Sequence, residues 1–282
     1  MTLASASSAS HVTTINRLTT LRVPPTVALA FVVIALVIAW SLAPGLFTSQ
    51  NPVNGISSDK LLSPSAAHWF GTDHLGRDVY TRVVYGTASS VTSALIAVVI
   101  AAVAGGLIGL LAGFLGGWVD IVLARLVDVL LAIPNFLLAV IVVTAIGFDT
   151  TNAAIATGVS AVAVFARVMR SEVIKTRQAT FVEAAFPLGG SRWHILLRHV
   201  LPNASRSVLP LAVLQFGLSI LVIASLAFLG YGDLPPASDW GLLISIGKDY
   251  LKWPWLVYAP AFVTIATVLS VNRISRWLRK TD

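Results

Sequence analysis

SEVIKTRQATFVEAAFPLGGSRWHILLRHVLPN, residues 171–203, is the longest polar interruption in the C-terminal half of an otherwise apolar chain. Apolar segments of membrane-spanning length, about 20 residues, flank it on both sides. Its first part favours a helix that Pro187 and the following glycines end, and Ser191 is a good N-cap for a second, amphipathic helix that ends at Pro202. The pattern predicts a membrane protein that exposes a compact helix–turn–helix on one side, a shape suited to docking a partner.

Composition supports this interpretation. Of 282 residues, 56% are apolar and only 11% are charged, whereas a soluble domain has about 25% charged residues. We therefore expect an all-α integral membrane protein, because open strand edges are not tolerated in hydrocarbon. The net charge of +7 lies in clusters beside the apolar runs, where lipid headgroups explain it without a nucleic-acid partner. The absence of cysteine excludes disulfides, thiolate metal sites and a cysteine nucleophile.

Hydropathy predicts six transmembrane helices. The first is too long for a cleaved signal peptide. The predicted spans are residues 26–47, 89–115, 121–147, 152–168, 208–231 and 255–271. The corresponding organisation is an N-terminal tail 1–23, a first transmembrane helix 24–47, an outer segment 48–88, a core of five spans 89–272 that contains the loop 171–205, and a basic tail 273–282.

Lysine and arginine placement predicts the orientation. Most of these residues lie on the side of the loop 171–205 and of both termini. The positive-inside rule therefore makes that side cytoplasmic.

Small residues repeat along the second predicted span. Gly105, Gly109, Gly113 and Gly117 follow at four-residue spacing, which places them on one helical stripe. Such a stripe lets another helix approach at backbone distance. It is typical of simple bundle packing, and the alternative is a surface that slides during a transport cycle.

Charged residues are rare inside the predicted spans. Arg125 and Asp128 lie three residues apart near the cytoplasmic end of the third span, and we expect them to form a structural ion pair. Pro134 can kink the same span.

The chain offers little catalytic chemistry of its own. It lacks the mid-membrane ionisable groups that a secondary transporter needs and the GxxxxGK loop that cradles phosphates. His194 and His199 are five residues apart and do not share a helical face, so they do not form a metal pair. We expect neither catalytic residues nor a metal site, and energy for uphill transport would come from a partner through the loop 171–205.

Four sequence blocks resemble the permease subunits of binding-protein-dependent ATP-binding-cassette importers, specifically the C-type permease of the dipeptide/oligopeptide/nickel subfamily. Residues 183–203 are similar to the EAA motif of these permeases, and residues 68–78 look like the outer signature of the subfamily. The blocks 228–241 and 125–134 match in register. Pro187 inside the EAA motif and the basic tail after Asn272 depart from the family pattern.

The resemblance implies a division of labour. The chain would form half of a solute path in the bacterial cytoplasmic membrane with a second related permease. An external binding protein would deliver the solute, and two cytoplasmic ATPases would hold ATP and Mg, so that the chain itself is not an enzyme and binds no cofactor. The residues that would couple it to an ATPase are Glu183, Ala184, Ala185, Gly189, Arg192, His199, Pro202 and Asn203.

Within this coupling element the side chains have different expected roles. Ala184, Ala185 and Gly189 would permit close approach, and Glu183 would fix the loop by charge-assisted hydrogen bonds. The alternative for Glu183 is an ordinary solvated helix residue.

The outer motif has two interpretations. It could recognise the binding protein or line the entry, or it could pin an interfacial helix against the bundle through ion pairs. The four-residue spacing of Asp73 and Arg77 favours the second interpretation, and the block 235–241 is typical of an ordered turn at the membrane surface. The outer-motif residues are Gly71, Asp73, Gly76, Arg77 and Asp78.

Two functions from different classes remain at this point. The first is the importer subunit, with di- or oligopeptides as the favoured solutes and glutathione-like compounds or metal chelates as further possibilities. The second is a stand-alone carrier or a membrane-embedded enzyme, in which residues 171–203 form an ordinary basic loop. A polar cluster that faces the bundle interior would favour the second function, and the sequence does not show one.

Overall fold

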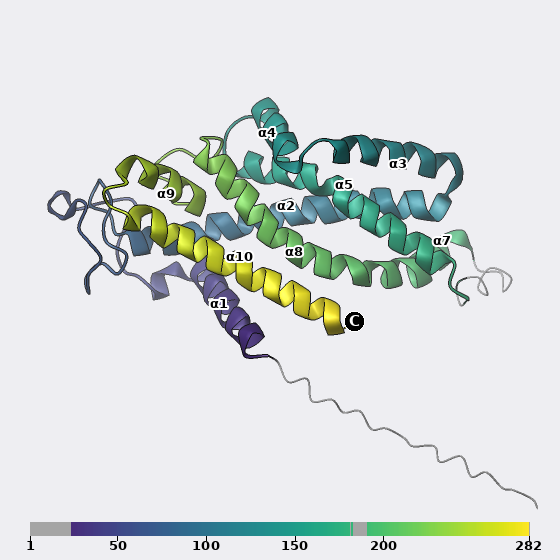
Figure 1. Ribbon diagram of the computed structural model, residues 1–282, viewed down its shortest axis with the longest axis horizontal. Coiled ribbons are helices and arrows are strands. Elements are labelled where there is room, and N and C mark those ends of the chain that lie inside the picture. Colours follow the sequence, from purple (N-terminus) through teal and green to yellow (C-terminus); the bar gives the residue numbers. More distant parts are fainter. Residues whose placement is uncertain (1–23, 181, 183–190, 282) are drawn as a thin grey trace, which may run out of the picture.

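The protein is an elongated bundle of helices (Figure 1). This computed structural model describes residues 24–180, 182 and 191–281, so the predicted tail 1–23 and residues 183–190 of the predicted loop lie outside the described residues. Among the described residues, the one strand-like feature is an isolated antiparallel bridge between Thr72 and Asp78. The helices are α1 (Pro25–Leu42), α2 (Val79–Leu115), α3 (Gly117–Ala132), α4 (Asn135–Ile146), α5 (Thr150–Arg177), α7 (Arg192–Ile195), α8 (Leu201–Phe228), α9 (Trp240–Gly247) and α10 (Trp255–Thr281), with short 3-10 turns at Pro44–Leu46, Ser57–Asp59 and Lys248–Tyr250.

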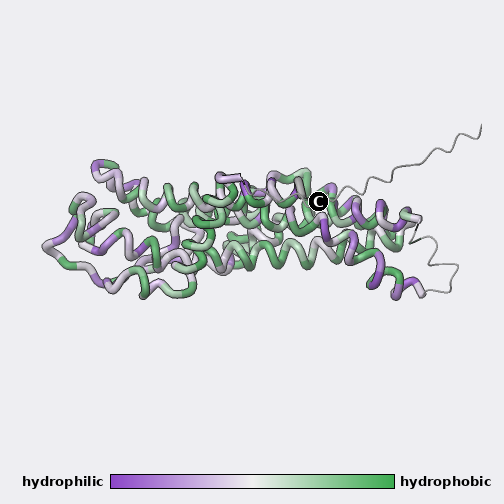
Figure 2. The backbone as a smooth tube through the Cα atoms, turned by 90° about the horizontal axis from the view of Figure 1, so that it is seen from below, coloured by the Kyte–Doolittle hydropathy of each residue, from purple (hydrophilic) through white to green (hydrophobic). Residues whose placement is uncertain are grey.

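The two ends of the bundle differ. We call the end where α5 stops and α7 begins the loop end, and the end that carries α9 and the segment between α1 and α2 the clasp end (Figure 1). Apolar residues fill the middle of the bundle and polar residues concentrate toward both ends (Figure 2). This distribution is the one expected of helices that cross a membrane.

The described helices provide five or six membrane spans. Five helical runs are long and apolar enough to cross a bilayer, and the bent pair α3–α4 makes a sixth if it counts as one span. The all-α, multi-span architecture expected from composition is confirmed. The five runs are Pro25–Leu42, Val79–Leu115, Thr150–Arg177, Arg192–Phe228 and Trp255–Arg279.

The predicted third span, 121–147, is not one continuous helix with a kink. The chain bends by 93° between α3 and α4. Ile133 is extended, with φ −88° and ψ 127°, because the ring of Pro134 disfavours a helical conformation in the residue before it. Pro134 therefore breaks the span instead of kinking it.

Two predicted boundaries also move. α2 begins at Val79 and not at residue 89, because the Asp78 carboxylate accepts a 2.7 Å hydrogen bond from the Thr81 backbone N–H and caps the helix. The second loop helix does not end at Pro202. It continues into α8 through a π-helical turn, Leu196–Val200, in which the Leu201 N–H bonds to the Leu196 carbonyl. Pro202 lies in the first turn of α8, where a missing N–H is tolerated.

The closest helix contact joins α2 to α5 through the glycine stripe. A Cβ atom added to Gly105, Gly109 or Gly113 would lie 2.4, 2.3 or 2.9 Å from the carbonyl oxygens of Val162, Ala166 and Arg170, respectively. These three glycines thus form the backbone contact that their spacing predicts. Gly117 does not take part: it has a φ of +58° and nothing within 4 Å of an added Cβ, because it forms the α2–α3 turn with Gly116.

We predict that Gly109→Ala destabilises the protein by about 1–3 kcal/mol, because the new methyl group meets backbone atoms of α5 that cannot move aside. The matched control is Gly106→Ala, whose methyl group would meet only Met169 Cε at 3.8 Å. Thermal unfolding of the detergent-solubilised protein measures both variants. Equal melting temperatures for the two variants would contradict the assigned packing.

Candidate functional site

At the loop end, the described residues include four of the eight predicted coupling residues: Arg192, His199, Pro202 and Asn203. Glu183, Ala184, Ala185 and Gly189 lie outside the described residues. Ser191 caps α7 by accepting a hydrogen bond from the His194 N–H at 3.2 Å, as its residue type predicts. Asn203 Nδ2 donates to the His199 carbonyl at 2.6 Å and thereby supports the π-helical turn.

An apolar cluster holds both flanks of the loop against the bundle. Val182 lies on one flank and Ile195 on the other, and both are fully buried. They pack with residues from the loop ends of α2, α5 and α8, so a displacement of the loop meets a packed core. The buried members of this cluster are Leu110, Phe114, Met169, Val173, Val182, Ile195, Leu196, Val200 and Ala204.

The opposite face of the second loop helix is open. Trp193 and Leu197 are 62% and 59% exposed, and the side chains of Arg192 and Arg198 are exposed beside them. The four apolar residues of this helix are therefore divided. Leu196 and Val200 are buried, and Trp193 and Leu197 are exposed. Trp and Arg are enriched at protein interfaces, so an exposed Trp between two arginines is typical of such a surface.

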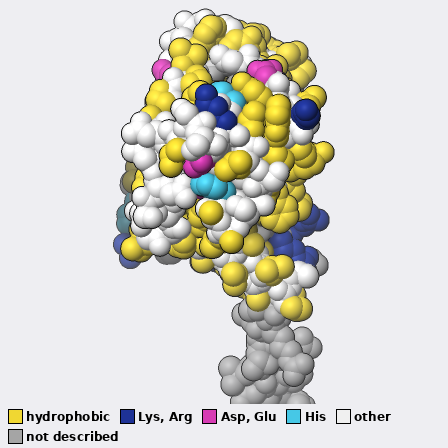
Figure 3. Space-filling view, turned by 90° about the vertical axis from the view of Figure 1, so that its left-hand side faces the viewer, with side chains coloured by type: hydrophobic (Ala, Val, Ile, Leu, Met, Phe, Trp, Pro, Cys, Tyr) yellow, Lys and Arg dark blue, Asp and Glu magenta, His cyan; other side chains and the backbone are white. Residues whose placement is uncertain are grey.

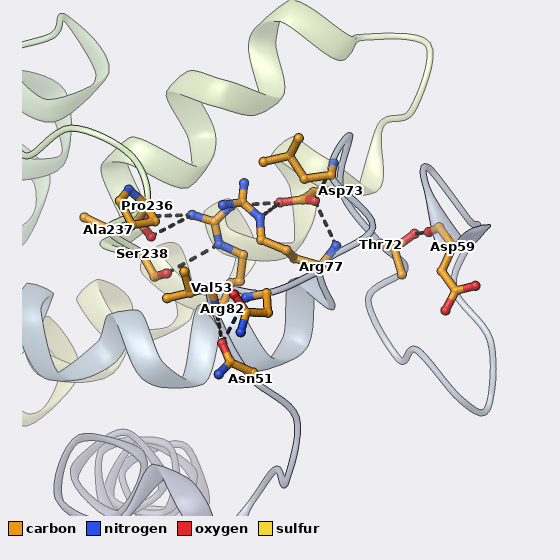
Figure 4. A network of polar contacts seen from close by, with 12 residues as sticks. Asn51, Val53, Asp59, Thr72, Asp73, Arg77, Arg82, Pro236, Ala237 and Ser238 are labelled. Atoms are coloured by element: carbon orange, nitrogen blue, oxygen red, sulfur yellow. Dashed lines mark hydrogen bonds and ion pairs between the residues drawn. The ribbon is translucent and has the colours of Figure 1, made fainter. Parts of the chain in front are cut away.

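At the clasp end, Asp73 is the centre of a buried polar network (Figure 4). Its carboxylate accepts hydrogen bonds from Arg77 Nε at 2.7 Å, from Arg82 Nη1 at 2.8 Å and from the backbone N–H groups of Leu75 and Arg77 at 2.9 and 3.0 Å. Burial by itself would raise the pKa of Asp73, but the backbone hydrogen bond and the positive charge of Arg77 bring it below its ordinary value. The carboxylate is therefore held ionised.

Arg82 connects this network to a distant part of the chain. It is 1% exposed, and its Nη2 donates to the Ala237 carbonyl at 2.7 Å (Figure 4). One turn later on α2, a Cβ at Gly86 would lie 1.6 Å from the Ser238 carbonyl oxygen, so only glycine fits there. Two successive turns of α2 thus clamp the segment before α9.

The outer motif forms a turn and not the interfacial helix that was expected. Gly71 and Gly76 have φ values of +72° and +76°, which favour glycine, and the bridge between Thr72 and Asp78 closes the turn. The Asp73–Arg77 ion pair that the spacing suggested is present, within this turn. Asp78 caps α2 and also contacts His68 Nδ1 at 2.9 Å.

The block 235–241 is the ordered turn that its composition predicted. Asp239 caps α9 by accepting from the Leu242 N–H at 3.1 Å, and the Trp240 indole donates to the Val83 carbonyl at 3.1 Å. Asp239 Oδ2 has no hydrogen-bond partner, and burial raises the pKa of this carboxyl group. Sequence reasoning did not single out Arg82 and Gly86, although their four-residue spacing at the start of an apolar helix is visible in the sequence.

The predicted Arg125–Asp128 ion pair is wrong. Asp128 instead accepts a hydrogen bond from Arg167 Nη2 at 2.8 Å, and Asp120 pairs with Arg170. α3 folds back along α5, so arginines of α5 reach these carboxylates across the helix interface (Figure 1).

Other chemistry is sparse. In the part of the chain that the structure describes, no three His, Cys, Asp or Glu side chains gather as a metal site. The clasp-end surface has scattered charges and histidines among uncharged and apolar side chains (Figure 3). The arrangement therefore consists of packed helices, a buried polar network around Asp73 and Arg82 at the clasp end, and an exposed face at the loop end.

Comparisons with known proteins agree with this architecture. Residues 105–281 match the family described as "Binding-protein-dependent transport system inner membrane component". In solved structures, the MetNI methionine ABC transporter has a chain with a TM-score of 0.58 at 16% identity, covering 71% of this chain and 96% of that chain. An amino acid ABC transporter has a TM-score of 0.56 at 16% identity, with coverages of 72% and 95%.

Curated relatives are more similar in sequence. "Dipeptide transport system permease protein DppC" of Alkalihalophilus pseudofirmus is 37% identical, covering 83% of this chain and 77% of that protein. "Probable D,D-dipeptide transport system permease protein DdpC" of Escherichia coli is 34% identical, with coverages of 91% and 86%. "Glutathione transport system permease protein GsiD" of Shigella flexneri is 42% identical, with coverages of 77% and 72%.

Each of these relatives is a permease protein by name, and the fold is shared with chains of ABC transporters. The chain belongs to the family of binding-protein-dependent transport system inner membrane components, as a multi-pass permease subunit of an ATP-binding-cassette importer.

Proposed function

We propose that this subunit imports di- or oligopeptides, as one half of a solute path that it forms with a second related permease. Two cytoplasmic ATPases would bind ATP and Mg and drive the cycle, and an external binding protein would deliver the solute. The observation that carries the proposal is the similarity over most of the chain to permeases named for dipeptide transport. Glutathione is the alternative solute, because relatives of similar identity are named for it.

The orientation follows from charge. The exposed arginines of α7 and the π-helical turn and those of the last turns of α10 lie at the loop-end side, where the positive-inside rule places the cytoplasm. Both termini would then be cytoplasmic, and the clasp end would face the binding protein.

The loop end would act as the coupling element. Trp193, Leu197 and Arg192 present an open face for an ATPase, and the buried residues on both flanks of the loop connect that face to α2, α5 and α8. A push on the loop would therefore move three helices together. ATP hydrolysis would reside on the partners, and this subunit would bind no cofactor of its own.

The first test is co-purification. A tagged chain extracted from its own host in mild detergent is expected to bring with it a second permease and two ATPases, identified by mass spectrometry. Recovery of the chain alone, stable and monodisperse, would favour a stand-alone carrier. A binding protein in the same complex would give a route to the solute.

We predict that Glu183→Lys abolishes peptide uptake in reconstituted vesicles while the complex still assembles, because it reverses a charge within the predicted coupling motif. Glu172→Lys is the control, since it makes the same charge change on α5, outside that motif. Uptake at the wild-type rate in Glu183→Lys would contradict the proposed coupling role of the motif.

The buried network of Asp73, Arg77 and Arg82, which we call the clasp, would hold the outer turn and the segment before α9 against α2. It would have no direct role in solute binding. Arg82→Leu should lower the free energy of unfolding by about 1–3 kcal/mol, because the buried Ala237 carbonyl and the Ser238 hydroxyl lose their donor, while Asp73 keeps its ion pair with Arg77. The comparison is Lys60→Ala, which removes an exposed cation from the segment between α1 and α2, and thermal unfolding measures both variants. If both variants melt together, the clasp does not stabilise the fold.

A further inference from the structure

Three arginines of α5 contact α3 or the end of α2. Arg167, Arg170 and Arg177 follow at spacings of three and seven residues, which places them on one side of the helix. Arg177 Nη1 donates to the Phe114 carbonyl at 3.1 Å, one of the carbonyls that the end of α2 leaves without a helical partner. The other two arginines contact carboxylates of α3.

These two ion pairs join the same helices but differ in geometry. Arg170 binds Asp120 through two parallel hydrogen bonds, Nε to Oδ1 at 2.5 Å and Nη2 to Oδ2 at 2.7 Å. The side chains of Arg170 and Asp120 are 37% and 21% exposed. Those of Arg167 and Asp128, which share a single hydrogen bond, are 60% and 53% exposed. A bidentate, partly shielded pair fixes orientation more strongly than an exposed single contact.

The first half of α3 has little apolar packing to hold it. Trp118, Ile121 and Val122 are 75%, 65% and 54% exposed, and the buried side chain of α3 is that of Val127. Asp120 lies in the first turn, close to the Gly116–Gly117 reversal, where a carboxylate also suits the helix dipole. Among the described residues, the Asp120–Arg170 pair is the polar side-chain contact that joins the first turn of α3 to α5.

We infer that Asp120 and Arg170 are positioning residues that make α3 move with α5 when the loop is displaced. The inference rests on the proposed coupling function. α5 ends at Arg177, immediately before the loop, so a force on the loop acts on α5. The bidentate pair passes that movement to the start of α3.

Spin labels can test directly whether the ion pair fixes the position of α3 relative to α5. The chain has no cysteine, so two cysteines for labelling can be introduced without other changes. Labels at the exposed positions Val122 of α3 and Thr151 of α5 report the distance between the two helices by pulsed electron resonance. We expect a narrow distribution that Asp120→Asn broadens and Asp128→Asn leaves unchanged. An unchanged distribution in Asp120→Asn would overturn the inference.

Transport then tests the consequence. In the assembled complex, Asp120→Asn should lower peptide uptake per ATP hydrolysed about fivefold, as expected for a coupling contact worth about 1 kcal/mol, with Asp128→Asn near wild type. The exchange Asp120→Arg with Arg170→Asp should recover part of the loss, which a purely steric role would not allow. Equal defects at Asp120 and Asp128, or no recovery on exchange, would contradict the positioning role. A wild-type complex without ATP-dependent uptake would instead refute the proposed function, and the spin-label distances would still decide the inference.

Discussion

The backbone contact between α2 and α5 is the constraint on which the rest of the structure depends. Carbonyl oxygens of α5 enter the space that side chains would fill at Gly105, Gly109 and Gly113. The same contact also occurs with the two helices exchanged, because Gly158 of α5 lies against the backbone of Ala97 in α2. In a bilayer the hydrophobic effect does not hold helices together, so close van der Waals contact over several turns has to supply the cohesion. The two helices therefore behave as one body.

This contact also bears on the alternative that the glycine stripe is a sliding surface. A carbonyl seated at each of three successive glycines leaves no smooth track, because a shift by less than a full turn would bring the next side chain against a backbone oxygen. Movement is thus expected between the α2–α5 body and two neighbours, α10 and the part of α8 beyond Pro210. Prolines inside α8 and α10, at Pro210 and Pro260, are sites where those neighbours can bend.

α2 carries this rigid body to both ends of the molecule. At the clasp end its residues Arg82 and Gly86 hold the segment before α9, and at the loop end Leu110 and Phe114 belong to the apolar cluster around the loop flanks. A helix of 37 residues is about 55 Å long, more than the hydrocarbon core requires. The first turns of α2, at the clasp end, are buried and include Thr81, Arg82 and Thr87 among apolar residues, and these polar residues explain why hydropathy placed the start of the span later.

The sequence predicts the features that depend on local chemistry. The apolar runs, the cap at Ser191 and the helix contact of Gly105, Gly109 and Gly113 follow from residue type and spacing. The partners of Asp73 and Asp128 do not follow in the same way. Asp73 receives its expected partner Arg77, but Arg82 joins the same carboxylate, and Asp128 binds Arg167 across 39 residues of sequence.

The difference has a physical origin. Residues three or four apart meet whenever a helix or turn forms, but a pair across two helices depends on where each helix bends. The break at Pro134 and the two-glycine turn before α3 set the line along which α3 runs back over α5. That line brings Asp120 and Asp128 to the arginines of α5 and leaves Arg125 on the exposed side. The positive-inside rule uses the arginines of α5 only to predict orientation. In the structure, Arg167 and Arg170 also hold α3, the first half of the broken span, against α5.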